Sequence, residues 1–328
     1  MNVETKKQHY VPQFLLNNWS CGKKKRLHIF DKKESKSFCS SVRNSAHENN
    51  FYNDDILGYG NKTETKLSSL EADVAPIIKK IISAGSLISI TQEEHHVLCL
   101  FTAVQMLRTN STREFITDFQ EILDNKFGSM GFDIDKDEKN SFKLSDKEIK
   151  SSSINILNTL PGDLLELFID KDLILLKAHS DSSFYISDNP IVKHNNIKIP
   201  HRGSLGLSQE GIEVYFPLSP HYCLLFLCEK TSTTIRKKYT NYRAQSVLGT
   251  TNPDVDLSNL EFVYESLTNK AVLHTSKENI EFNNSQQVIQ STRFVYSNNA
   301  DFDLAFDMLK TNPEIATQSK VVDGSTVF

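Results

Sequence analysis

The hydrophobic pattern changes its period near residue 170, and this change constrains the fold more than any other feature of the sequence. Upstream, apolar residues recur at helical spacing, as in Leu67, Leu70, Val74, Ile77, Ile78 and Ile81. Downstream, short apolar runs typical of strands follow one another, at 173–178, 184–187, 212–217 and 222–228. This order predicts an α+β fold in which an N-terminal helical half packs on a mostly antiparallel sheet in the C-terminal half, rather than a doubly wound sheet.

Several local signals place the expected elements more closely. A Ser or Thr followed three residues later by Glu, the capping box of a helix N-terminus, occurs at Thr91, Ser111 and Ser145. Residues 27–31 and 37–42 are expected to pair as a hairpin across a polar turn. The C-terminal third is less regular, and we expect helices there near 257–269, 284–292 and 301–310.

The domain organisation follows from length and pattern together. A chain of 328 residues is long enough for one large domain or two. We expect a single domain over residues 1–320, with a helical part at roughly 60–169 and a sheet-rich part at roughly 170–300. Residues 321–328 are expected to be a frayed tail.

Composition excludes several classes of protein. A net charge of −4 gives no global attraction to nucleic acid or to an anionic membrane, so any such binding must come from a local patch. Five cysteines without a Cys-x-x-Cys pair argue against a disulfide framework or a zinc finger. The sequence starts without the apolar core of a signal peptide, and no window approaches 18 apolar residues. We therefore expect a cytoplasmic protein that has no membrane partner.

Arg108 points most directly to a site. On the helix expected from Thr91, it falls on the inward apolar stripe between Phe101 and Val104. A guanidinium does not lose its proton, and a buried charge without a partner is very costly, so an acidic side chain should meet it. Glu64 and Glu71 are the candidates, because they lie on one edge of the preceding helical stripe.

Six short motifs also carry a family resemblance. They are Gln8–Leu16, Leu27–Asp31, Leu67–Glu71, Gln105–Arg108, Ser187–Pro190 and Phe216–Pro220. With these motifs in this order, over most of its length, the sequence resembles the family catalogued as domain of unknown function 4238. The resemblance implies a mainly bacterial protein and brings no established reaction with it.

The leading functional hypothesis joins residues from these distant motifs into one polar site. Its members are His9, Glu64, Glu71, Gln105, Arg108, Asp188 and Asn189. Hydrolysis of a phosphodiester needs an anchored divalent cation or an activated water, and a positive charge for the negative charge that develops. These residues predict a metal-assisted hydrolase. The specific hypothesis is a nuclease that acts in bacterial defence or stress.

Each residue has an expected role in that hypothesis. Glu64, Glu71 and Asp188 would hold a divalent metal such as Mg²⁺, with Glu71 and Asp188 also acting on the water. His9 would act as acid or base, and Arg108 would clamp the phosphate. Gln105 and Asn189 would bind the substrate.

The alternative is a non-enzymatic protein that binds a ligand or a partner, with the same cluster as a structural lock or a sensing pocket. Arg108 and Glu71 would then be a buried ion pair between two helices. His9 would be a core histidine, and Asp188 and Asn189 would form a turn before Pro190. Spacing alone does not decide between the two hypotheses.

A basic turn offers a second candidate surface. Lys24, Lys25 and Arg26 follow Gly22 within a run of four basic residues and could contact the phosphates of nucleic acid. A basic turn in a chain of this net charge is also simply a solvated surface. The oligomeric state is left open by the sequence.

Overall fold

The computed structural model describes residues 6–54, 56–59, 62–130, 143–197, 205–250 and 258–317. The described helices are α1 Gln13–Leu16, α2 Lys62–Ala84, α3 Gln92–Leu107, α4 Asn110–Ser129, α5 Asp146–Thr159, α6 Pro161–Ile169, α7 Glu229–Val247, α8 Ser258–Asn269, α9 Lys277–Gln290 and α10 Asp303–Thr311. The described strands are β1 Lys7–His9, β2 Arg26–Asp31, β3 Lys36–Ser41, β4 His47–Asn49, β5 Asp172–Lys177, β6 Ile186–Ser187, β7 Val192–Asn195, β8 Ile212–Ser219, β9 Tyr222–Leu227, β10 Leu273–His274 and β11 Phe294–Ser297. These elements confirm the expected α+β fold, and the expected frayed tail lies outside the described residues.

The described strands form three sheets. One has five strands in the order β10-β5-β9-β8-β7, one has four in the order β3-β2-β11-β6, and β1 pairs with β4. All of these pairs are antiparallel except β10 with β5. The hairpin expected from 27–31 and 37–42 is confirmed as β2 and β3. One expected strand joins a different sheet: 184–187 contains β6, which pairs with β11 and not with β5, β8 or β9.

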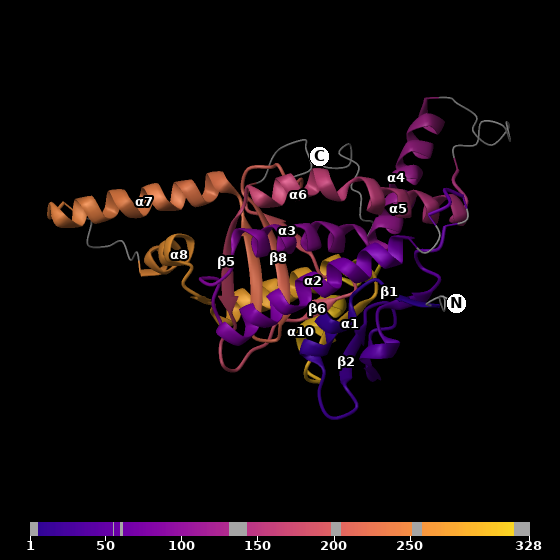
Figure 1. The fold of residues 1–328 in the computed structure, drawn as a ribbon, viewed down its shortest axis with the longest axis horizontal. Coiled ribbons are helices and arrows are strands. Elements are labelled where there is room, and N and C mark those ends of the chain that lie inside the picture. Colours follow the sequence, from indigo (N-terminus) through magenta and orange to yellow (C-terminus); the bar gives the residue numbers. More distant parts are fainter. Residues whose placement is uncertain are drawn as a thin grey trace.

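Helices cover both faces of the five-stranded sheet (Figure 1). Successive residues of a strand point to opposite faces, and β5 shows this, because Leu173 and Leu175 enter one apolar cluster while Ile174 and Leu176 enter another. The first cluster includes the ring of Phe101 on α3, and the second includes residues of α8 and α9. A sheet covered on both faces explains why its strands appear in the sequence as continuous apolar runs.

The four-stranded sheet packs on the C-terminal helices. The ring of Phe30 on β2 packs on the ring of Phe302, the residue before α10, with ring centroids 5.6 Å apart. The neighbouring Lys32 is almost completely buried, and its ammonium group donates hydrogen bonds to the carbonyls of Val288, Ile289 and Ser291 at the end of α9. These carbonyls have no partner within the helix, so Lys32 caps α9 from the sheet.

Two of the three expected capping boxes are confirmed, at Thr91 and Ser145. The third is wrong, because α4 begins at Asn110 and Ser111 therefore lies inside its first turn. The preceding Thr109 makes no side-chain cap, and its hydroxyl donates a hydrogen bond to Asn189 instead. The helix α4 therefore starts two residues earlier than the local motif predicts.

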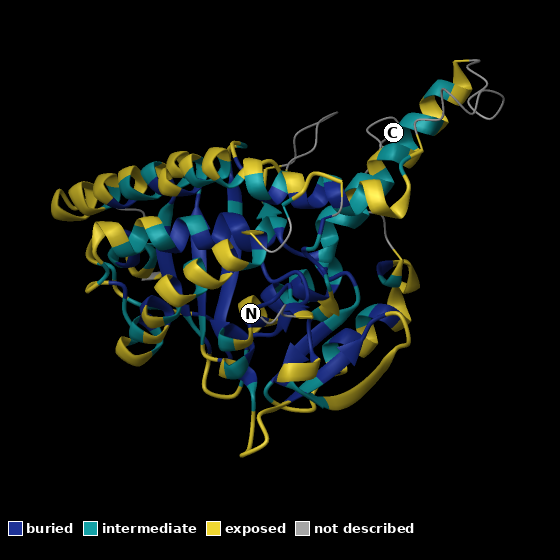
Figure 2. Cartoon of the chain, turned by 45° about the vertical axis from the view of Figure 1, so that its right-hand side comes forward, coloured by how far each residue is buried: buried dark blue, intermediate teal, exposed yellow. Residues whose placement is uncertain are grey.

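Two long helices leave the body of the molecule. Figure 2 shows dark blue buried residues in the sheets and on the helix faces toward them, whereas α4 projects without any buried residue. On α7 only Ser232 and Tyr239 are buried. Within the described part of the chain, no helix has the length and apolar character needed to cross a bilayer.

Candidate functional site

Arg108 ends α3, and its side chain is only 2% exposed. Its Nη1 donates to Oε1 of Glu71 on α2 at 2.7 Å, and its Nη2 donates to the backbone carbonyl of His9 at 2.7 Å. Glu71 is thus the acidic partner that the buried guanidinium requires. Burial alone would lower the pKa of Arg108, but the neighbouring Tyr52 and Glu71 outweigh it and raise that pKa, so the charge is fixed.

Tyr52 completes the coordination of the guanidinium, and sequence reasoning missed it. Its hydroxyl accepts a hydrogen bond from Arg108 Nε at 3.1 Å and lies 3.2 Å from the carbonyl of His9, to which it can donate. Burial raises the pKa of Tyr52 to about 12, so it stays protonated. Gln8 holds its backbone, since the Oε1 atom accepts from Tyr52 N–H at 2.6 Å. The only signal was an aromatic pair, Phe51-Tyr52, in an otherwise polar loop.

Glu64 and Gln105 lie beside this arrangement. Gln105 is fully buried one turn before Arg108, and its Nε2 donates to the carbonyl of Tyr10, next to His9. Glu64 is partly buried on α2, and burial raises the pKa of its carboxyl against the opposing charge of Arg108. We call His9, Tyr52, Glu64, Glu71, Gln105 and Arg108 the Arg108 cluster.

Three polar atoms of the Arg108 cluster are buried without a hydrogen-bond partner among the described residues. They are Nε2 of His9, Oε2 of Glu64 and Oε1 of Gln105. Buried polar atoms in folded proteins are nearly always paired, so each exception calls for a physical reason. These three come from β1, α2 and α3.

The tautomer of His9 follows from its contacts. The ring stacks on His47 of the paired strand, with centroids 5.3 Å apart, and it hydrogen-bonds the backbone of Arg43. Because Nε2 has no partner among the described residues, we assign the ring proton to Nδ1, which leaves a lone pair on Nε2. Burial first, and then His47, lower the pKa of His9 to about 4, against the raising effect of the Arg43 bond. The ring is therefore neutral at pH 7.

This neutral histidine makes the stability depend on pH. The pKa of His9 is lower in the folded chain than the 6.5 of a free histidine, so its contribution is present above pH 6.5 and is lost as pH falls through 4. Between pH 7 and 4.5 the unfolding free energy of the native protein should fall by about 1–2 kcal/mol more than that of His9→Gln. The effect is no larger because solvent screens the partly exposed ring. Urea unfolding at both pH values measures this difference. Equal losses for the two proteins would contradict a neutral buried ring.

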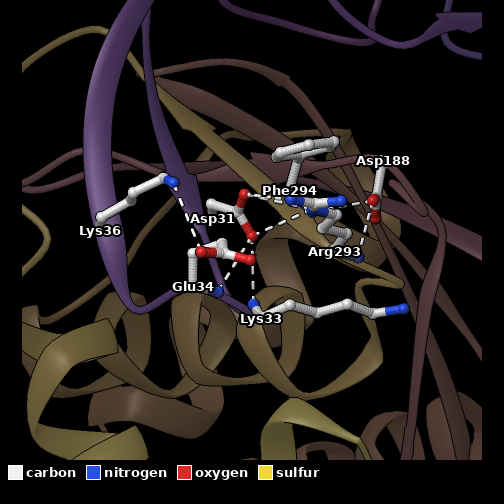
Figure 3. A network of polar contacts seen from close by, with 7 residues as sticks. All are labelled: Asp31, Lys33, Glu34, Lys36, Asp188, Arg293 and Phe294. Carbon is white, nitrogen blue, oxygen red and sulfur yellow. Dashed lines mark hydrogen bonds and ion pairs between the residues drawn. The ribbon is translucent and has the colours of Figure 1, made fainter.

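Asp188 lies elsewhere, against the start of β11. Its carboxylate is 1% exposed, and its Oδ1 accepts from the N–H of Thr292 at 2.8 Å. Its Oδ2 accepts from the Thr292 hydroxyl and from the N–H groups of Arg293 and Phe294, each at 2.8 Å. Figure 3 shows the carboxylate facing this segment. Within the described residues no hydrogen bond or ion pair joins Asp188 to Arg108, and the segment 292–294 occupies both oxygens of the Asp188 carboxylate.

The same segment is fixed from its other side by Asp31 (Figure 3). The guanidinium of Arg293 donates to both carboxylate oxygens of Asp31, with the shortest contact at 2.7 Å. Burial would raise the pKa of Asp31, but the bonds from Arg293 and from the backbone of Glu34 and Lys33 outweigh it and lower that pKa. Asp31 and Asp188 together anchor the first residues of β11.

Asn189 makes a different set of contacts from Asp188. Its Oδ1 accepts from the hydroxyl of Thr109, the residue after Arg108, at 3.2 Å. Its Nδ2 donates to the carbonyl of Gln290 at 3.0 Å. The amide predicted to bind substrate therefore ties the end of α3 to the end of α9.

Two of the three residues expected to hold Mg²⁺ make other contacts in the structure, and the metal site stays a prediction. Glu71 is paired with Arg108, and the oxygens of Asp188 are occupied by four protein donors. Across the described ranges, no three His, Cys, Asp or Glu side chains are grouped as a metal ion requires. Glu64 alone does not make a site for a divalent ion.

The basic turn is a separate feature. Lys24, Lys25 and Arg26 are all exposed where β2 begins. Arg26 donates to the carbonyl of Cys39 on the paired strand β3 at 3.2 Å. In the part of the chain that the structure describes, no hydrogen bond or ion pair joins this turn to the Arg108 cluster. Its predicted contact with nucleic acid stays a prediction.

Comparison with known proteins gives one match. No curated protein and no solved structure matches the chain. The model of one family matches residues 7–301, a range that contains the Arg108 cluster, Asp188 and both larger sheets. This match covers most of the chain, and all six motifs lie within it. The chain therefore belongs to the family described as protein of unknown function (DUF4238).

Proposed function

We propose that this protein is a non-enzymatic binding protein whose Arg108 cluster recognises a hydrogen-bond-donating group of a ligand or partner. The observation that carries the proposal is the set of three buried, unpaired atoms on His9, Glu64 and Gln105. Each such atom costs about 1–3 kcal/mol while it is unpaired. A ligand that supplies donors to them recovers this free energy as binding affinity.

The chemistry of these atoms favours a donor group over a phosphate. Gln105 Oε1 accepts hydrogen bonds, Glu64 Oε2 accepts when ionised, and His9 Nε2 offers its lone pair. The oxygens of a phosphodiester also only accept, so they would face groups of their own kind. Arg108, the expected phosphate clamp, already donates to Glu71, to Tyr52 and to the carbonyl of His9. Amines, guanidinium groups and amides are the ligand groups that suit these atoms.

The Glu71 side chain is 27% exposed, and His9 and Glu64 are partly exposed, while Arg108 and Gln105 are buried. The three unpaired atoms are themselves buried, so a ligand group would reach them once the partly exposed side chains of His9 and Glu64 move aside. A metal-assisted nuclease in bacterial defence or stress stays a prediction, and so does a cytoplasmic location.

The proposal is tested with small probes that differ in hydrogen-bonding character. Saturation-transfer NMR would compare methylguanidinium with dimethyl phosphate on the native protein and on Glu64→Gln. We expect methylguanidinium to bind and Glu64→Gln to weaken that binding about tenfold, as loss of one charge-assisted hydrogen bond implies. Asp73→Asn is the matched control, since Asp73 is an exposed carboxylate on the same helix.

Two results would overturn the proposal. Preferential binding of dimethyl phosphate would show that the cluster accepts a phosphate after all. Cleavage of labelled single-stranded DNA or RNA by the native protein, lost in Glu64→Gln and kept in Asp73→Asn, would restore the nuclease hypothesis.

A further inference from the structure

A polar pocket of about 530 Å³ lies away from the Arg108 cluster. Its walls are the segment 180–185, His221, the first two turns of α9, and the segment 298–304, which includes the start of α10. None of its lining residues belongs to the Arg108 cluster. Its volume is in the range of small-molecule sites, which is about 300–1,000 Å³.

The charge of this pocket is strongly one-sided. Its lining includes one lysine, Lys277, and four acidic residues, Asp181, Glu281, Asp301 and Asp303. Lys277 is already 3.8 Å from Glu281. Within the described residues, no ion pair reaches the other three carboxylates. Oδ1 of Asp301 accepts a hydrogen bond from the backbone N–H of Asp303 at 3.2 Å. The pocket therefore presents an excess of negative charge from two separate segments.

The wall between these carboxylates is fixed and also accepts hydrogen bonds. The hydroxyl of Tyr185 donates to the carbonyl of Asp301 at 2.8 Å. The amide of Asn284 is used on both sides, since it accepts from the N–H of Tyr185 and donates to the carbonyl of Ser183. The Oδ1 atom of Asn298 is buried without a partner among the described residues. A ligand that brings an N–H donor can pair with this atom.

The hydroxyl of Tyr185 lies close to two of these residues, Asp301 and Asp303. Burial raises the pKa of its hydroxyl, and the negative charges of Asp301 and Asp303 raise it further. Across the described ranges, however, no three His, Cys, Asp or Glu side chains are grouped as one metal ion requires. Negative charges that are spread around a pocket of this size suit a molecule with several separated positive charges.

We propose that this pocket binds a small polyvalent organic cation, an aliphatic di- or polyamine, through Asp181, Asp301 and Asp303. Its ammonium groups would supply positive charges for these carboxylates and N–H donors for Oδ1 of Asn298. Its methylene chain would lie against the ring of Tyr185 and the side chain of Ile280. This site is separate from the Arg108 cluster, so either proposal stands without the other.

Isothermal titration calorimetry with spermidine tests the site. We expect the double variant Asp301→Asn, Asp303→Asn to bind spermidine at least tenfold more weakly than the native protein. The matched control is Asp163→Asn, Asp307→Asn, which removes two exposed carboxylates outside the pocket and should leave the affinity within twofold. Circular dichroism melting curves confirm that each variant is folded.

Three outcomes would overturn the inference. If both double variants bound spermidine equally weakly, the binding would come from the net negative charge of the protein and not from this pocket. Displacement of spermidine by Mg²⁺ at equal concentration would indicate a metal site instead. Absence of binding by the folded native protein at low ionic strength, where such attraction is strongest, would remove the site altogether.

Discussion

Asp188→Asn is expected to lower the free energy of unfolding by about 4 kcal/mol or more, the largest effect that we predict for a single substitution. The native carboxylate accepts four hydrogen bonds from Thr292, Arg293 and Phe294 and is almost completely buried. An amide replaces one acceptor oxygen with an NH₂ group, which would face N–H donors of the backbone. Urea unfolding at pH 7 measures the loss.

The control for this substitution is Asp170→Asn. Asp170 is exposed at the end of α6, so its replacement should change the unfolding free energy by less than about 0.5 kcal/mol. A stable Asp188→Asn protein would contradict an anchoring role, and a stable variant that had also lost an activity would support the catalytic role predicted from the sequence.

The second large effect concerns the pair of Arg108 and Glu71. Replacing Glu71 with Gln should lower the unfolding free energy by about 3 kcal/mol, because it leaves the charge of Arg108 buried and unneutralised. Arg108→Met should cost a similar amount, since it also removes the donors to Tyr52 and to the His9 carbonyl. Urea unfolding of both variants and of the double variant gives the coupling between them.

We expect the double variant to lose less stability than the sum of the single losses, with a coupling of about 1–3 kcal/mol. Asp73→Asn on the same helix is the control and should have little effect. If each single variant lost less than about 1 kcal/mol of unfolding free energy, the ion pair would be solvated and would not hold α2 against α3.

The sequence predicts this ion pair because helical phase fixes both of its members. Glu71 lies on the edge of one amphipathic stripe and Arg108 on another, so the pair follows once α2 and α3 pack together. No helical phase indicates where the side chain of Asp188 points, because Asp188 lies outside a helix. It is adjacent to Asn189, yet the two side chains contact different parts of the protein, and the partners of Asp188 lie far along the chain. Tyr52 lies in an irregular loop, where the sequence has no hydrophobic periodicity from which the position of its side chain could be predicted.

The same reasoning separates the elements that were predicted from those that were missed. The helix α3 and the strands β5, β8 and β9 carry apolar patterns, because their burial is extensive. In contrast, α7 was missed, since a helix that buries only two residues leaves no stripe in the sequence. The strand β7 was missed because only Val192 in it is buried. Long-range pairing with β8 makes this segment a strand, not its own composition.

The most direct test of the Arg108 cluster as a binding site is the ring ¹⁵N signal of His9 at pH 7. We predict an unprotonated Nε2 whose signal moves toward that of a hydrogen-bonded nitrogen as methylguanidinium is added. A ring that is already protonated at pH 7, or an Nε2 signal that stays unchanged at saturating methylguanidinium, would contradict it.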